Sequence, residues 1–132
     1  MANDLVIAKD DWLEVADALK DLPAPFRREI FLLECHVAGT TRVDDVEKKT
    51  GDLAEGDALT LRREPENASD PFAIAVHTAK NDRVGWVPQR KSVVISRLMD
   101  AGKLVYAKVA SREIVEEDDW VDVRMKIYMR DV

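Results

Sequence analysis

The residues best suited to recognise a ligand are polar side chains of one tight corner, Asn67, Ser69 and Asp70. Pro65 removes a backbone donor near the start of this corner. Pro71 pushes Asp70 away from helical backbone angles. Asparagine, serine and aspartate side chains also bond their own backbone in turns. A corner with this chemistry holds its polar groups in fixed directions, and polar groups held in fixed directions can recognise a ligand.

Two predicted strands flank the corner. Residues 59–63 alternate apolar with polar side chains, which is the period of a half-buried strand. Residues 72–76 follow the corner as an apolar strand. The sequence therefore predicts that the corner joins two strands of the core.

The spacing Glu-Pro-x-Asn-x-x-Asp-x-x-Ala-Ile-x-Val over residues 64–76 resembles the signature of the HIRAN domain. Val-Ala-Gly-Thr at 37–40 and Gly-Trp-Val-Pro at 85–88 fall in the expected order, and the resemblance covers 31–130. HIRAN domains are found at the N-terminus of certain DNA-remodelling helicases and as small stand-alone bacterial proteins. The resemblance implies a small β-barrel of the OB type that binds single-stranded DNA, in the helicases at a free 3′-hydroxyl end.

The resemblance also implies roles for particular residues. Asp70 matches the aspartate that receives the 3′-hydroxyl, and Ser69 stands where many members have tyrosine. Thr41 and Arg42 stand where members carry a basic and an aromatic residue. Arg42 either lies on a base, pairs with a phosphate or is simply solvated. Asp70 either contacts the ligand or caps its own turn, and its two oxygens allow both.

Further candidates lie within and just after the Gly-Trp-Val-Pro motif at 85–88. Trp86 is the best remaining aromatic platform, or else a tryptophan of the core or its rim. Gln89 stands near the position where the family often has a basic residue, and Arg90 and Lys91 follow at the start of a predicted helix. A helix N-terminus beside cations is a natural phosphate site. The predicted DNA-binding residues are Thr41, Arg42, Asn67, Ser69, Asp70, Trp86, Gln89, Arg90 and Lys91.

Composition limits the class of protein. The chain has 132 residues, 46% of them hydrophobic, which suits one domain with one core. The formal net charge of −6 argues against broad nonspecific DNA affinity, although it leaves room for a local basic face. Cys35 is the single cysteine, so no internal disulfide is expected, and His36 and His77 are too isolated to predict a zinc site. We expect no metal and no cofactor.

The predicted architecture is mainly β (α+β). We expect a small antiparallel OB-like β-barrel of about six strands with two flanking helices and an added N-terminal helix. Strands are predicted over residues 29–38, 58–64, 72–76, 83–87, 104–115 and 120–130, and helices over 44–50 and 92–101. The predicted core faces are Phe31, Leu33, Cys35 and Val37 in the first strand and Val94, Ile95, Leu98 and Met99 in the second helix.

The first 28 residues lie outside the motif pattern. A helix from Asp10 or Asp11 to about Lys20 would carry one apolar stripe, and a proline connector follows it. We expect residues 1–28 to pack on the barrel of residues 29–132. The alternative is that the predicted helix is a docking site for a partner protein. No signal peptide or membrane-spanning segment is predicted, so a cytoplasmic location is expected.

The residues predict binding rather than catalysis. There is no nucleophile elbow, no phosphate-binding glycine loop and no paired histidines, and Cys35 is predicted to be an inert buried thiol. The leading hypothesis is a non-catalytic module that binds single-stranded DNA or a 3′ end in repair or replication-related processes. A helicase or nuclease would be its partner, and the protein itself would be a monomer or a weak homodimer.

A second hypothesis is a protein-interaction adaptor that keeps the barrel without the nucleotide pocket. It rests on Arg42 and Ser69, which replace two stacking aromatics, and on the negative net charge. The predicted N-terminal helix and a surface with Trp120 and Tyr128 are the candidate contacts of such an adaptor.

Overall fold

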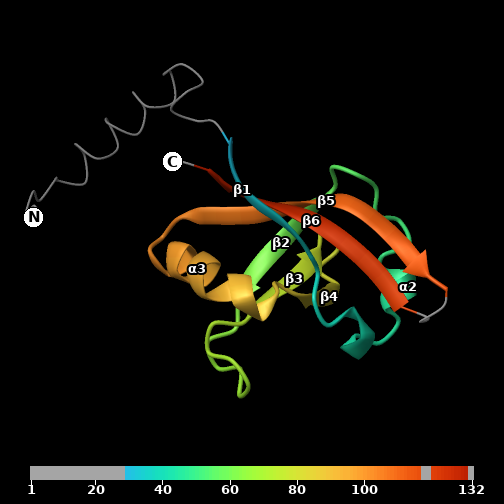
Figure 1. Ribbon diagram of the computed structural model, residues 1–132, viewed down its shortest axis with the longest axis horizontal. Helices are drawn as coiled ribbons and strands as arrows, with labels where there is room; N and C mark the ends of the chain where they lie inside the picture. The colour runs from blue at the N-terminus through green and yellow to red at the C-terminus, as the bar shows by residue number, and fades with distance from the viewer. Residues whose placement is uncertain (1–28, 117–119, 131–132) are drawn as a thin grey trace, which may run out of the picture.

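The computed structural model describes residues 29–116 and 120–130 (Figure 1). The predicted N-terminal helix and proline connector lie outside these residues. The strands are β1 (Glu29–His36), β2 (Ala58–Arg63), β3 (Ile74–Thr78), β4 (Arg83–Trp86), β5 (Leu104–Val115) and β6 (Trp120–Arg130). The helical segments are η2 (Thr40–Arg42), α2 (Val46–Lys49) and α3 (Gln89–Asp100).

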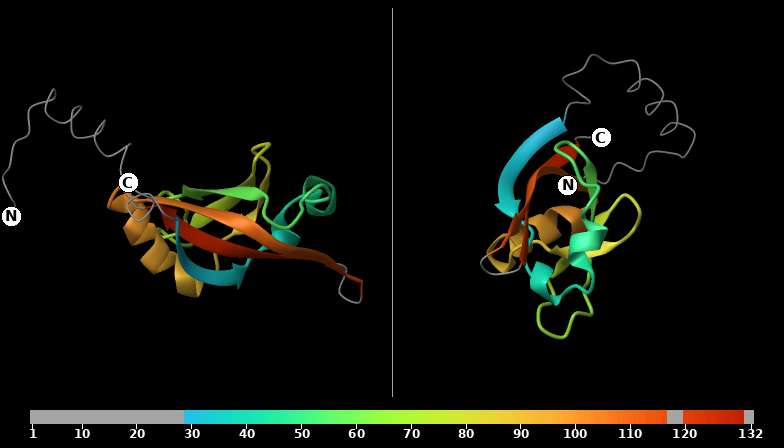
Figure 2. Two further views of the ribbon diagram at one scale, coloured as in Figure 1. Left: turned by 90° about the horizontal axis from the view of Figure 1, so that it is seen from above. Right: turned by 90° about the vertical axis from the view of Figure 1, so that its right-hand side faces the viewer.

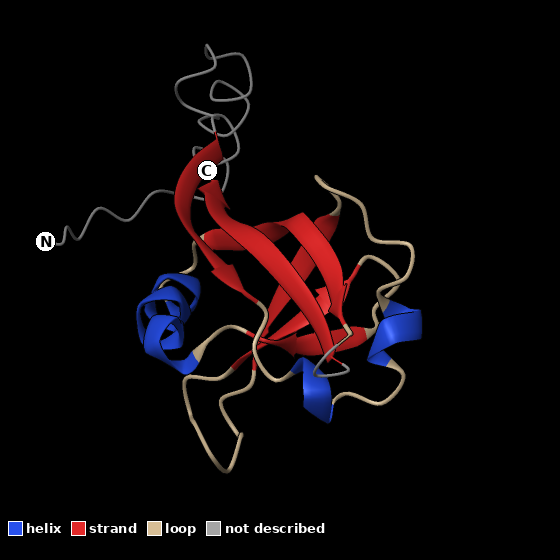
Figure 3. Cartoon of the chain, turned by 45° about the vertical axis from the view of Figure 1, so that its right-hand side comes forward, coloured by secondary structure: helices blue, strands red, loops and turns tan. Residues whose placement is uncertain are grey.

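All six strands form one curled antiparallel sheet in the order β1-β6-β5-β2-β3-β4. β5 and β6 are the longest strands and run the length of the domain (Figure 2). The helices lie at the periphery of the curled strands, with α3 on one side and the two short helical segments on another (Figure 3). This is the predicted small OB-like fold with two flanking helices, and the fold prediction is confirmed.

Two backbone hydrogen bonds between Ala38 and Trp86 close the curled sheet. The Ala38 N–H donates to the Trp86 carbonyl at 2.7 Å, and the Trp86 N–H donates to the Ala38 carbonyl at 2.8 Å. This bridge connects the chain just after β1 to the end of β4, the two edges of the sheet. Gly85 makes the close approach feasible, since a Cβ at this position would lie 2.4 Å from the Ala38 carbonyl oxygen.

Alternation of side chains along the strands builds the core. In β6, Val121, Val123, Met125 and Ile127 are buried, whereas the residues between them are partly or fully exposed. Burying each such side chain stabilises the fold by about 1.5–3 kcal/mol. The sequence periodicity therefore identified the inner face of this strand correctly.

The first strand departs from simple alternation. Phe31 was predicted to face the core, but 52% of it is exposed. The pairing of β1 with β6 shifts between Phe31 and Leu33, and this bulge moves the face that Phe31 presents to the outside. Beyond the bulge, Cys35 and Val37 are buried as predicted.

Helix α3 turns most of the predicted face inward. It begins at Gln89, three residues earlier than expected. Ile95 is buried, and Leu98 and Met99 pack against the core as predicted, but Val94 is 64% exposed. Ser92 and Ser96 are buried beside Ile95, because their i, i+3, i+4 spacing continues the inward stripe. The two serine hydroxyls donate to carbonyls of the same helix, at 3.0 Å for Ser92 and 2.8 Å for Ser96. Burial therefore leaves neither hydroxyl unpaired.

No helix within the described ranges 29–116 and 120–130 is long and apolar enough to cross a lipid bilayer.

We expect Gly85→Ala to destabilise the domain by about 1–3 kcal/mol, because the new methyl group would force apart the Ala38–Trp86 bridge. Urea unfolding measures this loss. Gly51→Ala is the matched control, since a Cβ at this position would lie 3.4 Å from its nearest neighbour, the Lys48 carbonyl oxygen, which is an ordinary contact. Equal stability of the two variants would contradict the role assigned to the bridge.

The Cys35 thiol should react slowly while the protein is folded. Burial raises the pKa of Cys35 from 9.0 to about 11, so the thiolate fraction at pH 8 falls about a hundredfold. An aromatic disulfide reagent should label the folded chain far more slowly than the chain in guanidinium. Rapid stoichiometric labelling of the folded protein would show that this thiol is accessible and ionised.

Candidate functional site

A groove with a volume of about 490 Å³ lies where three separate segments of the chain meet. The first segment follows β1, the second is the corner between β2 and β3, and the third connects β4 to α3. The residues that line the groove are Ala38, Gly39, Thr41, Arg42, Asn67, Ser69, Asp70, Ala73, Trp86, Val87 and Gln89. The closing bridge between Ala38 and Trp86 brings the first and third segments together.

Asn67 organises the corner. Its side-chain oxygen accepts hydrogen bonds from the backbone N–H groups of Ser69 at 2.9 Å and Asp70 at 3.1 Å. Its side-chain nitrogen donates to Glu64 Oε1 at 3.3 Å. Asn67 is thus a turn former that fixes the backbone leading to Asp70. Its amide is occupied by the protein itself, although the residue lines the groove.

Asp70 uses its two carboxylate oxygens differently. Oδ1 accepts a hydrogen bond from the backbone N–H of Phe72 at 2.9 Å, which caps the turn. Within residues 29–116 and 120–130, Oδ2 has only the Ser92 hydroxyl at 3.5 Å, and that hydroxyl also reaches the Gln89 carbonyl at a shorter 3.0 Å. A hydroxyl has one proton to donate, so Oδ2 retains acceptor capacity. Asp70 is therefore held in place by one oxygen and offers the other.

Glu64 positions the tryptophan that forms one wall of the groove. Glu64 Oε1 accepts from the Trp86 indole N–H at 3.0 Å, and its second oxygen pairs with Arg83. The Arg83 guanidinium lies 5.3 Å from the centroid of the Trp86 ring. Gly39, with φ of +72°, lies against the same ring, and a Cβ there would come within 2.7 Å of a ring carbon. Glycine is required at this contact for both reasons.

Arg63 fastens the corner to α3. Its guanidinium donates to both carboxylate oxygens of Asp100, at 2.9 and 3.2 Å, and to the carbonyls of Pro71 and Ala73, each at 3.1 Å. The hydrogen bond from Arg63 lowers the pKa of Asp100. The corner is therefore tied at its base as well as through Asn67.

The structure brings seven of the nine predicted residues together in the groove: Thr41, Arg42, Asn67, Ser69, Asp70, Trp86 and Gln89. Arg90 and Lys91 are not among the lining residues. Successive residues on a helix point about 100° apart, so only the first of these three neighbours faces the groove. Among the described residues that line the groove, Arg42 is the one cation.

The sequence and the fold resemble those of known proteins. The HIRAN domain model matches residues 30–130. The chain belongs to the HIRAN domain family. Among solved structures, a protein from Lactobacillus plantarum matches with a TM-score of 0.71 and 24% identity, over 80% of this chain and 99% of that one.

The HIRAN domain of human HLTF matches with a TM-score of 0.57 and 18% identity, over 78% of this chain and 81% of that one. The NMR structure of the HLTF HIRAN domain in its DNA-bound conformation matches with a TM-score of 0.49 and 18% identity, over 86% and 83%. The first two structures share the fold of this HIRAN domain. No curated protein sequence matches the chain.

The groove of this HIRAN domain is lined by several hydrogen-bonding side chains. Its polar groups are a carboxylate, an arginine, two hydroxyls and two amides. Among the described residues, no three histidine, cysteine, aspartate or glutamate side chains are grouped to hold a metal ion. Cys35 is buried in the core, and its high thiol pKa makes it a poor nucleophile. The arrangement is suited to hydrogen bonding with a ligand.

Two supporting residues of this HIRAN domain were not predicted to act at the site. Glu64 opens the signature, but its bonds to Trp86 and Arg83 join residues that lie far apart in the sequence. Arg63 was interpreted only as a polar residue of an alternating strand. The spacing of glutamate and asparagine within the Glu-Pro-x-Asn motif was the available signal for Glu64, since their side chains bond to each other.

Replacement of Glu64 by alanine should destabilise this HIRAN domain by about 1–3 kcal/mol, because it leaves the Trp86 indole N–H without its acceptor and Arg83 without its partner. Urea unfolding measures the loss. Glu64→Gln keeps an acceptor for the indole and should lose less stability. Glu66→Ala, an exposed neighbour, is the control. If all three variants unfold like the original chain, the network does not hold the wall of the groove.

Proposed function

We propose that this HIRAN domain is a non-catalytic DNA-binding module that recognises single-stranded DNA at a 3′ end. The observation that carries the proposal is the convergence of Arg42, Asp70 and Trp86, from three segments of the chain, on one groove. A volume of about 490 Å³ lies within the ordinary range for small-ligand pockets, about 300–1,000 Å³. This size is suited to a terminal nucleotide.

Asp70 supplies the recognition of the end. Its Oδ2 accepts a hydrogen bond from the terminal 3′-hydroxyl, while the Phe72 N–H holds Oδ1 in place. A hydrogen bond to a charged acceptor is about twice as strong as one between neutral groups. A 3′-phosphate would bring negative charge against the same carboxylate and would be rejected. Asp70 therefore distinguishes a free hydroxyl from a blocked end.

Arg42 and Trp86 hold the rest of the nucleotide. Arg42 is exposed at the groove and pairs with a phosphate, and the wall formed by Trp86 contacts the base or sugar. Phosphate contacts set position and carry no sequence information. With one cation in the groove and a net charge of −6, affinity is modest and weakens as salt rises. Repair or replication, with a helicase or nuclease as partner, is the setting that this activity suits.

Fluorescence polarisation at low salt tests the proposal with strands that end in a 3′-hydroxyl or a 3′-phosphate. We expect about a tenfold preference for the hydroxyl, the effect of one charge-assisted hydrogen bond. Asp70→Asn keeps the bond to the Phe72 N–H and should abolish the preference. Asp52→Asn, in a different cleft, should preserve it. Equal binding of both strands by the unmodified protein would remove end recognition.

A protein-interaction adaptor is the second candidate function. The observation in its favour is an aromatic cluster on the outer face of the sheet, where Phe31 lies edge-on to Tyr128 at 5.7 Å and Tyr106 stacks on Tyr128 at 5.9 Å. Phe31 is half exposed, so this aromatic cluster presents an apolar surface to a partner. A partner captured equally by the protein and by a Phe31→Ser variant would reject this surface as the contact.

A further inference from the structure

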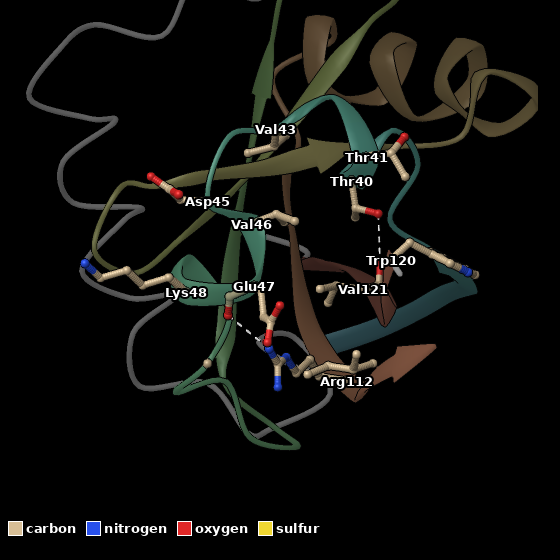
Figure 4. A pocket seen from close by; sticks show the side chains of 12 residues that line it. Thr40, Thr41, Val43, Asp45, Val46, Glu47, Lys48, Arg112, Trp120 and Val121 are labelled. Carbon is tan, nitrogen blue, oxygen red and sulfur yellow. Dashed lines mark hydrogen bonds between the residues drawn. The ribbon is translucent and has the colours of Figure 1, made fainter. Parts of the chain in front are cut away.

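A second cleft lies on the other side of η2 from the groove. It has a volume of about 730 Å³ and lies between the η2–α2 segment and the paired strands β5 and β6 (Figure 4). Thr41 lines both the cleft and the groove, so the two hollows meet at this residue. The neighbouring Thr40 hydroxyl donates to the Val121 carbonyl at 2.9 Å, which ties η2 to β6. The ridge between the two hollows is therefore fixed.

Arg112 projects into this second cleft in a fixed orientation. Its Nε donates to the Thr50 hydroxyl at 3.2 Å. Its Nη2 donates to the Glu47 carbonyl at 3.0 Å (Figure 4). A guanidinium has five N–H donors, so three remain. No carboxylate of residues 29–116 or 120–130 forms an ion pair with it. A positioned arginine with free donors is suited to bind a phosphate or carboxylate.

Apolar side chains share the walls of the cleft with polar and charged ones. Val43, Val46, Val121 and Ile114 line the cleft, and Ile114 is 42% exposed. Apolar side chains next to a fixed guanidinium match a nucleotide unit, in which a sugar and base accompany each phosphate.

We propose that a DNA strand whose 3′ end occupies the groove crosses the ridge at Thr41 and places an upstream phosphate on Arg112. This inference rests on the proposed function and extends it to a second subsite. Continuity of the two hollows supports it, together with the free donors of Arg112. Two further clefts are less suitable. Arg63 and Arg83 in one are already paired with carboxylates, and the other is lined by four aspartates.

The charges around the second cleft set the strength of the contact. Asp45 and Glu47 line it together with Lys48 and Arg112, so the formal charges cancel. The phosphate is therefore held by directed hydrogen bonds from Arg112 and not by a general positive field. Removal of the exposed Glu47 carboxylate should strengthen the contact.

Polarisation titrations compare a dinucleotide with an octanucleotide, both single-stranded with a free 3′-hydroxyl. Arg112→Lys keeps the charge and loses the planar fork, and Arg112→Gln loses both. We expect octanucleotide affinity to fall about three- to tenfold in Arg112→Gln, and its salt dependence to become shallower by about 0.7 in log–log slope. Dinucleotide affinity should not change. Arg62→Gln, an exposed arginine that lines none of the four clefts, is the control.

Three further variants keep the test independent of the structural bonds of Arg112. Ile114→Glu should weaken octanucleotide binding, whereas Ile114→Lys and Glu47→Gln should strengthen it. Unchanged octanucleotide affinity in all of these variants, or an equal loss for the dinucleotide, would overturn the second subsite and leave the groove intact. Failure of the unmodified protein to bind either strand would overturn the proposed function as well. Preferential binding of a peptide over DNA at this cleft would assign it to a protein partner.

Discussion

The hydrogen-bonded bridge between Ala38 and Trp86 is the constraint on which the rest of the molecule depends. It joins the two edges of the curled six-stranded sheet. The bridge also brings η2 and the start of α3 to the corner between β2 and β3. Because Gly85 has no side chain, its backbone can approach that of Ala38. Because Gly39 has none, the Trp86 ring can pack against it. Two glycines therefore support both the closure and the groove.

Hydrogen bonds within the protein fix the corner between β2 and β3 in the absence of a ligand. Asn67 satisfies its own turn, Glu64 holds Trp86 and Arg83, and Arg63 ties the base of the corner to α3. Most of the polar atoms in this region therefore have partners within the protein, and one oxygen of Asp70 remains available. A rigid site loses little conformational entropy on binding, so a small number of directed contacts can be enough.

Few positively charged side chains face this site. The chain carries a net charge of −6, and Arg63 and Arg83 are paired with carboxylates. Arg90 and Lys91, which the sequence suggested as phosphate partners, do not line the groove, because helix geometry directs them elsewhere. Arg42 and Arg112 are the arginines that face the two hollows joined at Thr41. Recognition on this surface consequently relies on shape and directed hydrogen bonds.

The sequence by itself determined those features of this protein that depend on residues close together in the chain. Strand alternation, the proline-bounded turn around Asn67 and the three family motifs depend on residues close in sequence, so they predicted the barrel and most residues of the groove. The bulge that exposes Phe31, the helix face that leaves Val94 outside and the bond from Glu64 to Trp86 were decided only in three dimensions. Each depends on the register and contacts of segments distant in the chain, which no local pattern encodes.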